Sequence, residues 1–134
     1  MAKFPEEEWL AALIEKLNTD VDYARIAEKW EGDMLVLIEP GGNLKEEKVI
    51  YLDLWHGKCR GGNFVQGQAA PNAVLNLRLP YENGVSLLKG ELDVMQALLT
   101  RKIGVKGNMA ILMRNVPTVL DFVRCCRAVS DDYL

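Results

Sequence analysis

The sequence contains few of the residues that commonly form catalytic or metal sites. Among its 134 residues there are one histidine and three cysteines. The cysteines are odd in number and do not have the spacing of a disulfide framework, which predicts reduced thiols. One of Cys125 and Cys126 is expected to pack in the core. Asp53, His56 and Cys59 do not form a credible metal or nucleophile site, because Asp53 and His56 point to opposite faces of a strand. We therefore expect a surface histidine, no metal, no cofactor and no catalytic residue.

Long hydrophobic runs are missing as well. No apolar stretch approaches the ~20 residues of a membrane-spanning helix. The first residues, MAKFPEEEWL, place glutamates where a secretory signal would need an apolar core. These absences predict a cytoplasmic protein without stable membrane insertion. The length of 134 residues predicts one domain over residues 1–134.

The charges are unevenly divided along the chain. Residues 1–48 hold 12 acidic and 6 basic side chains, whereas residues 49–134 hold 7 acidic and 10 basic ones. The basic residues of the second part would suit phosphate or lipid headgroups, but they are spread out and interleaved with acids, which favours a solvated face. Without a cluster of aromatic and basic residues, nucleic-acid binding is not expected.

Helical spacing organises the start of the chain. A first amphipathic helix over 5–17 begins near Pro5, whose missing N–H is harmless in a first turn. A second helix follows the N-cap segment 18–20 and ends at Gly32. Their apolar stripes are Trp9, Leu10, Leu13, Ile14 and Leu17 in the first helix and Val21, Ala24, Ala27 and Trp30 in the second.

Strand-type patterning follows from residue 33. Residues 34–38 and 48–55 form a predicted β-hairpin around the turn 40–43, and a third strand covers 59–65. Residues 73–79 alternate between apolar and polar positions, which is typical of an antiparallel sheet with one face covered by helices. In the second strand one face carries Ile50, Leu52 and Leu54 and the other carries Tyr51, Asp53 and Trp55.

The stretch from Gly90 to Met113 is the most informative part of the chain. It combines a helical segment, a short strand over 102–106 and a second helical segment that starts at Gly107-Asn108. Gly90 and Gly107 suit positive φ angles at the two turns. Asn108 is expected to cap the second segment, and Asp93 to favour the positive end of the first. A helix after Pro80 precedes this unit, and a final helix from 115–117 follows it with the stripe Val116, Val119, Leu120, Val123 and Cys126.

These motifs resemble a known family. The strand end Tyr51-Leu52-Asp53-Leu54-Trp55-His56-Gly57, the pattern Gly90-x-Leu92-Asp93-x-Met95-x-Ala97 and the following Lys102-Ile103-x-Val105-x-Gly107-Asn108 are similar to the sterol-carrier-protein (sterol-binding) domain family. The resemblance spans about residues 20–130, after the N-terminal helix. It implies an α+β fold in which a five-stranded, mainly antiparallel sheet is covered on one face by helices, with an apolar tunnel for lipids between them. The chain departs from the family at Pro80-Tyr81 and Gly84, which shape one side of that tunnel.

The resemblance also implies a function. We expect a non-enzymatic carrier of a sterol, fatty acyl or polyprenyl-type hydrophobe. Methionines would suit either an adaptable cavity wall or an ordinary core, and the resemblance favours the wall. The residues expected to line the tunnel are those on inward faces: Leu52, Leu54, Leu75, Leu77, Leu88, Met95, Leu98, Leu99, Ile103, Val105, Met109, Leu112, Met113, Leu120 and Val123.

A second hypothesis is a filled-core module that dimerises or scaffolds a partner. Domains that resemble this family also occur as non-catalytic parts of larger enzymes and as accessory factors in lipid or quinone metabolism. Under this hypothesis Trp30, Tyr51 and Trp55 would be exposed for contact, since aromatic residues are favoured at interfaces.

Overall fold

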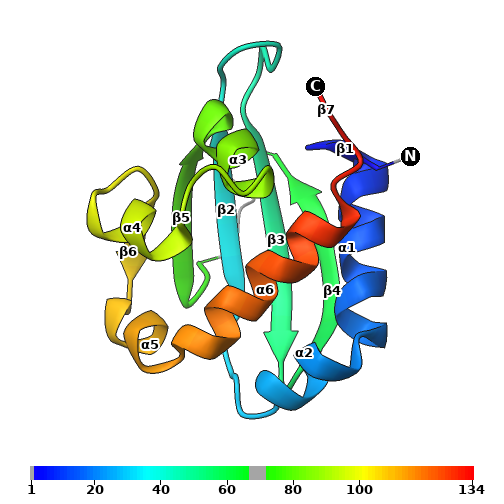
Figure 1. Cartoon of the computed structure of the whole chain (residues 1–134), viewed down its shortest axis with the longest axis vertical. Helices are drawn as coiled ribbons and strands as arrows, with labels where there is room; N and C mark the ends of the chain where they lie inside the picture. Colours follow the sequence, from blue (N-terminus) through cyan, green and yellow to red (C-terminus); the bar gives the residue numbers. More distant parts are fainter. Residues whose placement is uncertain (1, 67–71) are drawn as a thin grey trace.

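One mixed sheet forms the framework of the chain. The structure is a computed structural model that describes residues 2–66 and 72–134. Its five-stranded sheet has the order β4 (Lys58–Val65), β3 (Lys48–Trp55), β2 (Met34–Glu39), β5 (Leu75–Pro80) and β6 (Gly104–Gly107). Only β2 and β5 run parallel within this sheet, and the other neighbouring pairs are antiparallel. The prediction of a five-stranded, mainly antiparallel sheet is confirmed (Figure 1).

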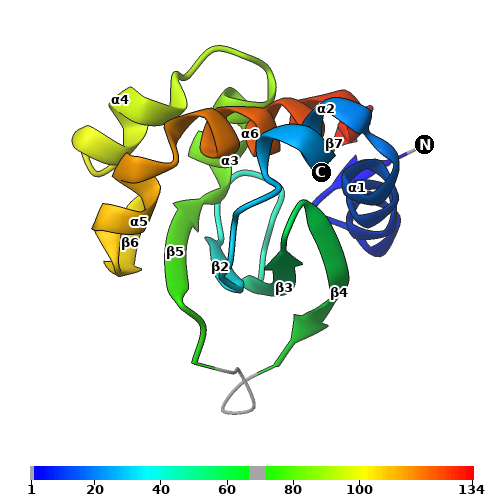
Figure 2. The same ribbon diagram turned by 90° about the horizontal axis from the view of Figure 1, so that it is seen from below.

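Helices cover one face of this sheet, as predicted. Figure 2 shows the sheet curving from β5 through β2 and β3 to β4, with the helices across its concave side. The helices are α1 (Glu7–Thr19), α2 (Val21–Ile26), α3 (Tyr81–Leu88), α4 (Val94–Leu99), α5 (Met109–Arg114) and α6 (Val116–Val129). Within residues 2–66 and 72–134, no helix has the length and apolar character needed to cross a membrane.

The first two helices differ at their ends from the prediction. Helix α1 starts at Glu7 rather than at Pro5, and α2 ends at Ile26 instead of continuing to Gly32. Asp20 caps α2 by accepting a hydrogen bond from the backbone N–H of Tyr23 at 2.9 Å. This bond satisfies a donor that the helix itself cannot pair. Because α2 ends at Ile26, Trp30 lies beyond this helix.

A glycine in β4 lets α1 approach the sheet. A Cβ atom at Gly62 would lie 2.9 Å from Leu52 Cδ2 and 3.1 Å from Ile14 Cδ1, closer than side-chain carbons normally pack. Gly62, one of two adjacent glycines that interrupt the β pattern of this strand in the sequence, thus makes room for α1 rather than breaking the strand.

The two ends of the described chain form an additional pair of strands that the sequence did not predict. β1 (Lys3–Phe4) runs parallel to β7 (Asp132–Tyr133). The backbone N–H of Ala2 also donates to the Asp131 carboxylate at 3.1 Å. Figure 1 shows the pair beside the start of α1, where it holds the C-terminal segment against the first helix.

Candidate ligand-binding cavity

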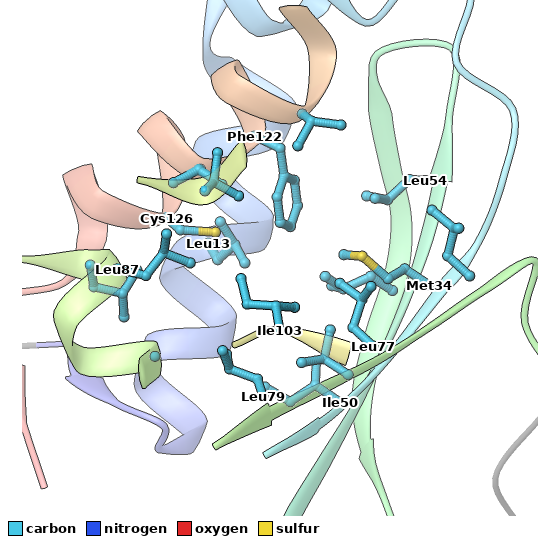
Figure 3. A pocket seen from close by; sticks show the side chains of 18 of the residues that line it. Leu13, Met34, Ile50, Leu54, Leu77, Leu79, Leu87, Ile103, Phe122 and Cys126 are labelled. Atoms are coloured by element: carbon cyan, nitrogen blue, oxygen red, sulfur yellow. The ribbon is translucent and has the colours of Figure 1, made fainter. Parts of the chain in front are cut away.

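An apolar cavity lies between the concave face of the sheet and the helices. Its volume is about 130 Å³. In Figure 3, Phe122 and Leu87 project into it from the helices, Met34 and Leu77 project from the sheet, and Ile103 lies between them. The cavity occupies the place where the sequence resemblance implies a tunnel.

The floor of the cavity follows from side-chain alternation along the strands. Ile50, Val36 and Leu77 are paired neighbours on β3, β2 and β5, so their side chains form one row across the inner face. A second row consists of Leu52, Met34 and Leu75 on the same strands. Val36 and Leu77 are only partly buried, although they lie beneath helices. The space above the middle of the sheet is therefore not filled by side chains.

Three polar side chains that line the cavity direct their hydrogen bonds to other parts of the chain. Trp9 Nε1 donates to Ser130 Oγ at 2.8 Å, Trp30 Nε1 donates to the Gly32 carbonyl at 2.9 Å, and Thr118 Oγ1 donates to the Ile26 carbonyl at 3.3 Å. Among the described residues, no buried side-chain nitrogen or oxygen lacks a hydrogen-bond partner. The contacts that the cavity offers are therefore almost entirely apolar.

The size of the cavity sets a limit on what fits without movement. A dry cavity of about 150 Å³ admits a molecule such as benzene, whereas sites for larger ligands measure about 300–1,000 Å³. The volume of about 130 Å³ belongs to the first class. A lipid can enter only if part of the wall moves.

Comparison with known proteins identifies the family. A family model described as the SCP-2 sterol transfer family matches residues 6–119. The chain belongs to this family. The comparison with curated proteins gives no match.

Solved structures agree with the membership of the SCP-2 family. A crystal structure of sterol carrier protein 2 has 28% identity and a TM-score of 0.83, over 93% of this chain and 98% of that chain. The conserved hypothetical protein TT1886 of Thermus thermophilus, possibly a sterol carrier protein, has 27% identity and a TM-score of 0.84, over 97% of this chain and 92% of that chain. A more distant fold relative is sterol carrier protein-2 from Aedes aegypti in complex with C16 fatty acid (palmitate), with 19% identity, a TM-score of 0.54, and coverage of 87% and 92%.

The structure of this SCP-2 family member brings together nine of the residues predicted to line its interior. These are Leu52, Leu54, Leu75, Leu77, Leu88, Leu98, Ile103, Leu112 and Val123. Whether they contact a ligand stays a prediction.

The other six predicted residues lie outside the cavity lining. Leu99, Met109, Met113 and Leu120 are exposed, so the expectation that they point inward was wrong. Met95 and Val105 are partly buried against the core without lining the cavity. The methionines expected to make the wall adaptable thus lie elsewhere, and among the lining residues Met34 supplies the thioether.

Several lining residues were not assigned to the site from the sequence. Trp9 and Leu13 belong to the predicted stripe of the first helix, whose periodicity indicates only an ordinary core face. Phe122 was passed over because the stripe of the last helix was placed on Leu120 instead. The other unassigned lining residues are Phe4, Tyr23, Trp30, Met34, Val36, Ile38, Ile50, Leu79, Gly84, Leu87, Val94, Thr118, Val119 and Cys126.

The turns around the Gly90 to Met113 unit are largely as predicted. Gly90 and Gly107 have φ angles of +78° and +123°. A Cβ at Gly107 would lie only 2.6 Å from the carbonyl oxygen of Val74, so glycine allows β6 to pair with β5. Asp93 caps α4 by accepting from the backbone N–H of Gln96 at 3.0 Å. Asn108 makes no side-chain cap hydrogen bond, which corrects the expected role of that residue.

A polar cluster between α6 and the start of α2 is an ion-pair network. Oxygen and sulfur atoms of Asp20, Asp121 and Cys125 lie within 4.8 Å of one another, a spacing that would suit a metal. The guanidinium of Arg124 is present there instead, 2.6 Å from Asp20 Oδ1 and 2.7 Å from Asp121 Oδ1. Its hydrogen bond holds the pKa of Asp20 well below the ordinary value, and the two carboxylates raise the pKa of Arg124. The cluster therefore ties α6 to the start of α2 by charge-assisted hydrogen bonds.

Asp53, His56 and Cys59 do not form one site. His56 is an exposed residue whose ring contacts the Glu31 carboxylate, in agreement with a surface histidine. The Asp53 carboxylate pairs with Arg60, whose N–H groups approach it at 3.0 and 3.1 Å. Cys59 is buried, and this burial raises the pKa of its thiol. The three side chains have separate structural partners.

The three aromatic residues assigned to the contact surface of a filled-core module differ in exposure. Trp30 is only 6% exposed and lines the cavity, so its assignment to a contact surface was wrong. Tyr51 donates its hydroxyl to Asp33 at 2.8 Å, and that bond raises the pKa of Tyr51 to about 12. Trp55 is 38% exposed, with the Arg60 guanidinium 4.7 Å from its ring centroid.

Proposed function

We propose that the protein binds the hydrocarbon part of a single-chain lipid, such as a fatty acyl group, and carries it without chemical change. The observation that supports this proposal is the cavity, whose lining consists almost entirely of apolar side chains. Removing hydrocarbon from water contributes about 0.8 kcal/mol for each buried methylene before ordering costs. Affinity then rises with the length of chain that the cavity accepts.

The almost wholly apolar lining favours an acyl chain over a hydroxylated ring system. A buried hydroxyl without a hydrogen bond costs about 1–3 kcal/mol. We expect the polar end of the ligand to remain at the cavity mouth, in water, while the chain extends inward. The palmitate complex of the Aedes aegypti relative, which shares this fold, supports a ligand of that shape.

Binding requires the cavity of about 130 Å³ to expand. Helices α4 and α5 contribute Val94, Leu98 and Leu112 to its wall. Each of these helices has only six residues. Short elements have few packed neighbours, so local opening there costs less than opening of the central sheet. We expect these two helices to move outward as the chain enters.

The test combines lipid analysis with a matched pair of variants. Native mass spectrometry and solvent extraction of purified protein are expected to find a bound lipid, and a fluorescent fatty acid is expected to bind after delipidation. Leu77→Asn places an amide in the cavity and should weaken that binding at least tenfold, equivalent to about 1.4 kcal/mol. The control Leu37→Asn makes the same change on the opposite face of the neighbouring strand, where Leu37 pairs with Arg78.

The two variants separate a cavity ligand from surface adsorption. Equal loss of binding in both variants would contradict the proposal, and so would the failure of the delipidated protein to bind any fatty acid. Circular dichroism during thermal unfolding must show that both variants fold. Chemical turnover of a bound lipid would overturn the assignment of a carrier.

A further inference from the structure

One long segment of the chain has no acidic residue. Between Val94 and Leu120 there are four basic side chains, Arg101, Lys102, Lys106 and Arg114, and no aspartate or glutamate. The other 107 residues hold 12 basic and 19 acidic side chains, a formal charge of −7. The nearest acids on either side have internal roles, because Asp93 caps α4 and Asp121 pairs with Arg124. We call residues 94–120 the basic segment.

The basic segment also carries most of the large exposed apolar side chains of the described chain. Leu99 is 66% exposed, Met113 and Leu120 are each 45% exposed, and Met109 is 39% exposed. The four basic side chains are exposed too, and none forms an ion pair with another described residue. Cationic and apolar groups are therefore presented to solvent by the same stretch of chain.

The fold gathers this segment at one end of the molecule. Both views show α4, β6 and α5 together beside the outer side of β5 (Figures 1 and 2). Exposed apolar residues alternate there with cavity residues: Leu99 follows Leu98, and Met113 follows Leu112. The same short helices thus present one side to the cavity and the other to solvent.

We propose that the basic segment docks on the surface of an anionic lipid bilayer. Lysine and arginine side chains are attracted to anionic headgroups, and exposed leucine and methionine side chains enter the boundary between headgroups and acyl chains. The segment has no aromatic residue on which a nucleic-acid base would stack. Like charges oppose pairing of this segment with its counterpart on a second copy of the chain. A bilayer matches both the charge and the apolar groups.

Docking goes beyond the proposed carriage of lipid and rests on surface residues alone. In the docked orientation α4 and α5 separate the cavity from the bilayer. The two helices expected to open would then face the source of the ligand. Docking and cavity binding are measured independently, so either proposal can fail while the other stands.

The experiment is flotation of the whole protein with vesicles. We expect binding to vesicles of phosphatidylcholine mixed with phosphatidylserine, much weaker binding to phosphatidylcholine alone, and release as salt is raised. Each cationic side chain near an anionic surface contributes about fivefold to partitioning, so Lys102→Gln with Lys106→Gln should reduce it about 25-fold. The matched control neutralises Lys29 and Lys58, which are exposed and lie outside the basic segment, and should change partitioning by less than about twofold.

A second pair of variants tests the apolar contribution. Leu99→Ser with Met113→Ser should weaken binding with little change in its salt dependence, whereas Val21→Ser, at a residue that is 81% exposed on α2, should have no effect. Equal binding to neutral and anionic vesicles would overturn the proposal, as would equal losses in the Lys102/Lys106 and Lys29/Lys58 variants. Self-association abolished by the basic-segment variants, without vesicle binding, would assign the surface to a second copy instead. Fatty-acid binding in solution should remain intact in every variant.

Discussion

Replacement of Phe122 by alanine tests whether cavity volume controls the length of chain that binds. The ring of Phe122 points into the cavity and is partly buried (Figure 3). A cavity of about 150 Å³ holds one benzene ring, so loss of the phenyl group should about double the space of 130 Å³. Room for about three more methylenes, at about 0.8 kcal/mol each, corresponds to roughly 50-fold in affinity for the longest chains.

The cost of Phe122→Ala in folding free energy should be moderate. Loss of a fully packed phenylalanine costs roughly 3–5 kcal/mol, but one side of this ring already borders empty space and lacks contacts there. We therefore expect destabilisation of about 2 kcal/mol, measured by urea unfolding.

The binding assay is displacement of a fluorescent fatty acid by fatty acids of increasing length. Phe122→Ala should increase affinity for long chains while leaving that for short chains nearly unchanged. The control Leu120→Ala removes an apolar side chain that is 45% exposed on the same helix and does not line the cavity. The same chain-length profile in Phe122→Ala and wild type would refute the volume argument.

Three further predictions concern stability and thiol reactivity. Asp20→Ala should cost about 2–3 kcal/mol, because it removes both the α2 cap and the bond to Arg124, and Asp20→Asn should cost less, since the amide keeps the cap. Because the folded pKa of Asp20 is depressed, its contribution is full well above the ordinary value of 3.8 and is lost as pH falls below that value, which urea unfolding at a series of pH values would detect. All three thiols are buried, and burial raises the pKa of Cys125 to about 11, so thiol reagents at neutral pH should label them no faster than the protein opens. Gly107→Ala should cost about 2 kcal/mol or more through its positive φ and the Val74 contact, whereas Gly61→Ala, with no atom within 4 Å of the added Cβ, should be nearly neutral in thermal unfolding.

Strand patterning predicted most of the sheet because alternation specifies which side chains share a face. Ile50, Leu52 and Leu54 point to the helices as expected, and all three are buried. The parallel pairing of β2 with β5 could not be predicted in this way. Pairing partners depend on how the intervening chain crosses over the sheet, and periodicity within a strand contains no information on that path.

The last helix shows where periodicity fails for the site. Val119, Leu120, Phe122 and Val123 are all apolar, so they fit more than one inward-facing stripe. Tertiary packing turns Phe122 toward the cavity and leaves Leu120 exposed. Whether an interior is filled or hollow depends on side-chain volumes from many elements at once, and no local pattern records that sum.

The parallel pairing of β2 with β5 has a consequence for the order of folding. β2, β3 and β4 are consecutive along the chain and join through antiparallel turns, so they can assemble from local contacts. The second edge of β2 is paired only after β5 arrives, and its inner face is covered only after α6 closes over it; both steps require closure of a much longer loop. Refolding should therefore pass through a three-stranded intermediate with Val36 and Ile50 open to water, a species prone to aggregation at high concentration. The cavity is completed last, so a ligand present during refolding acts after the slow step and should leave the folding rate unchanged while slowing unfolding.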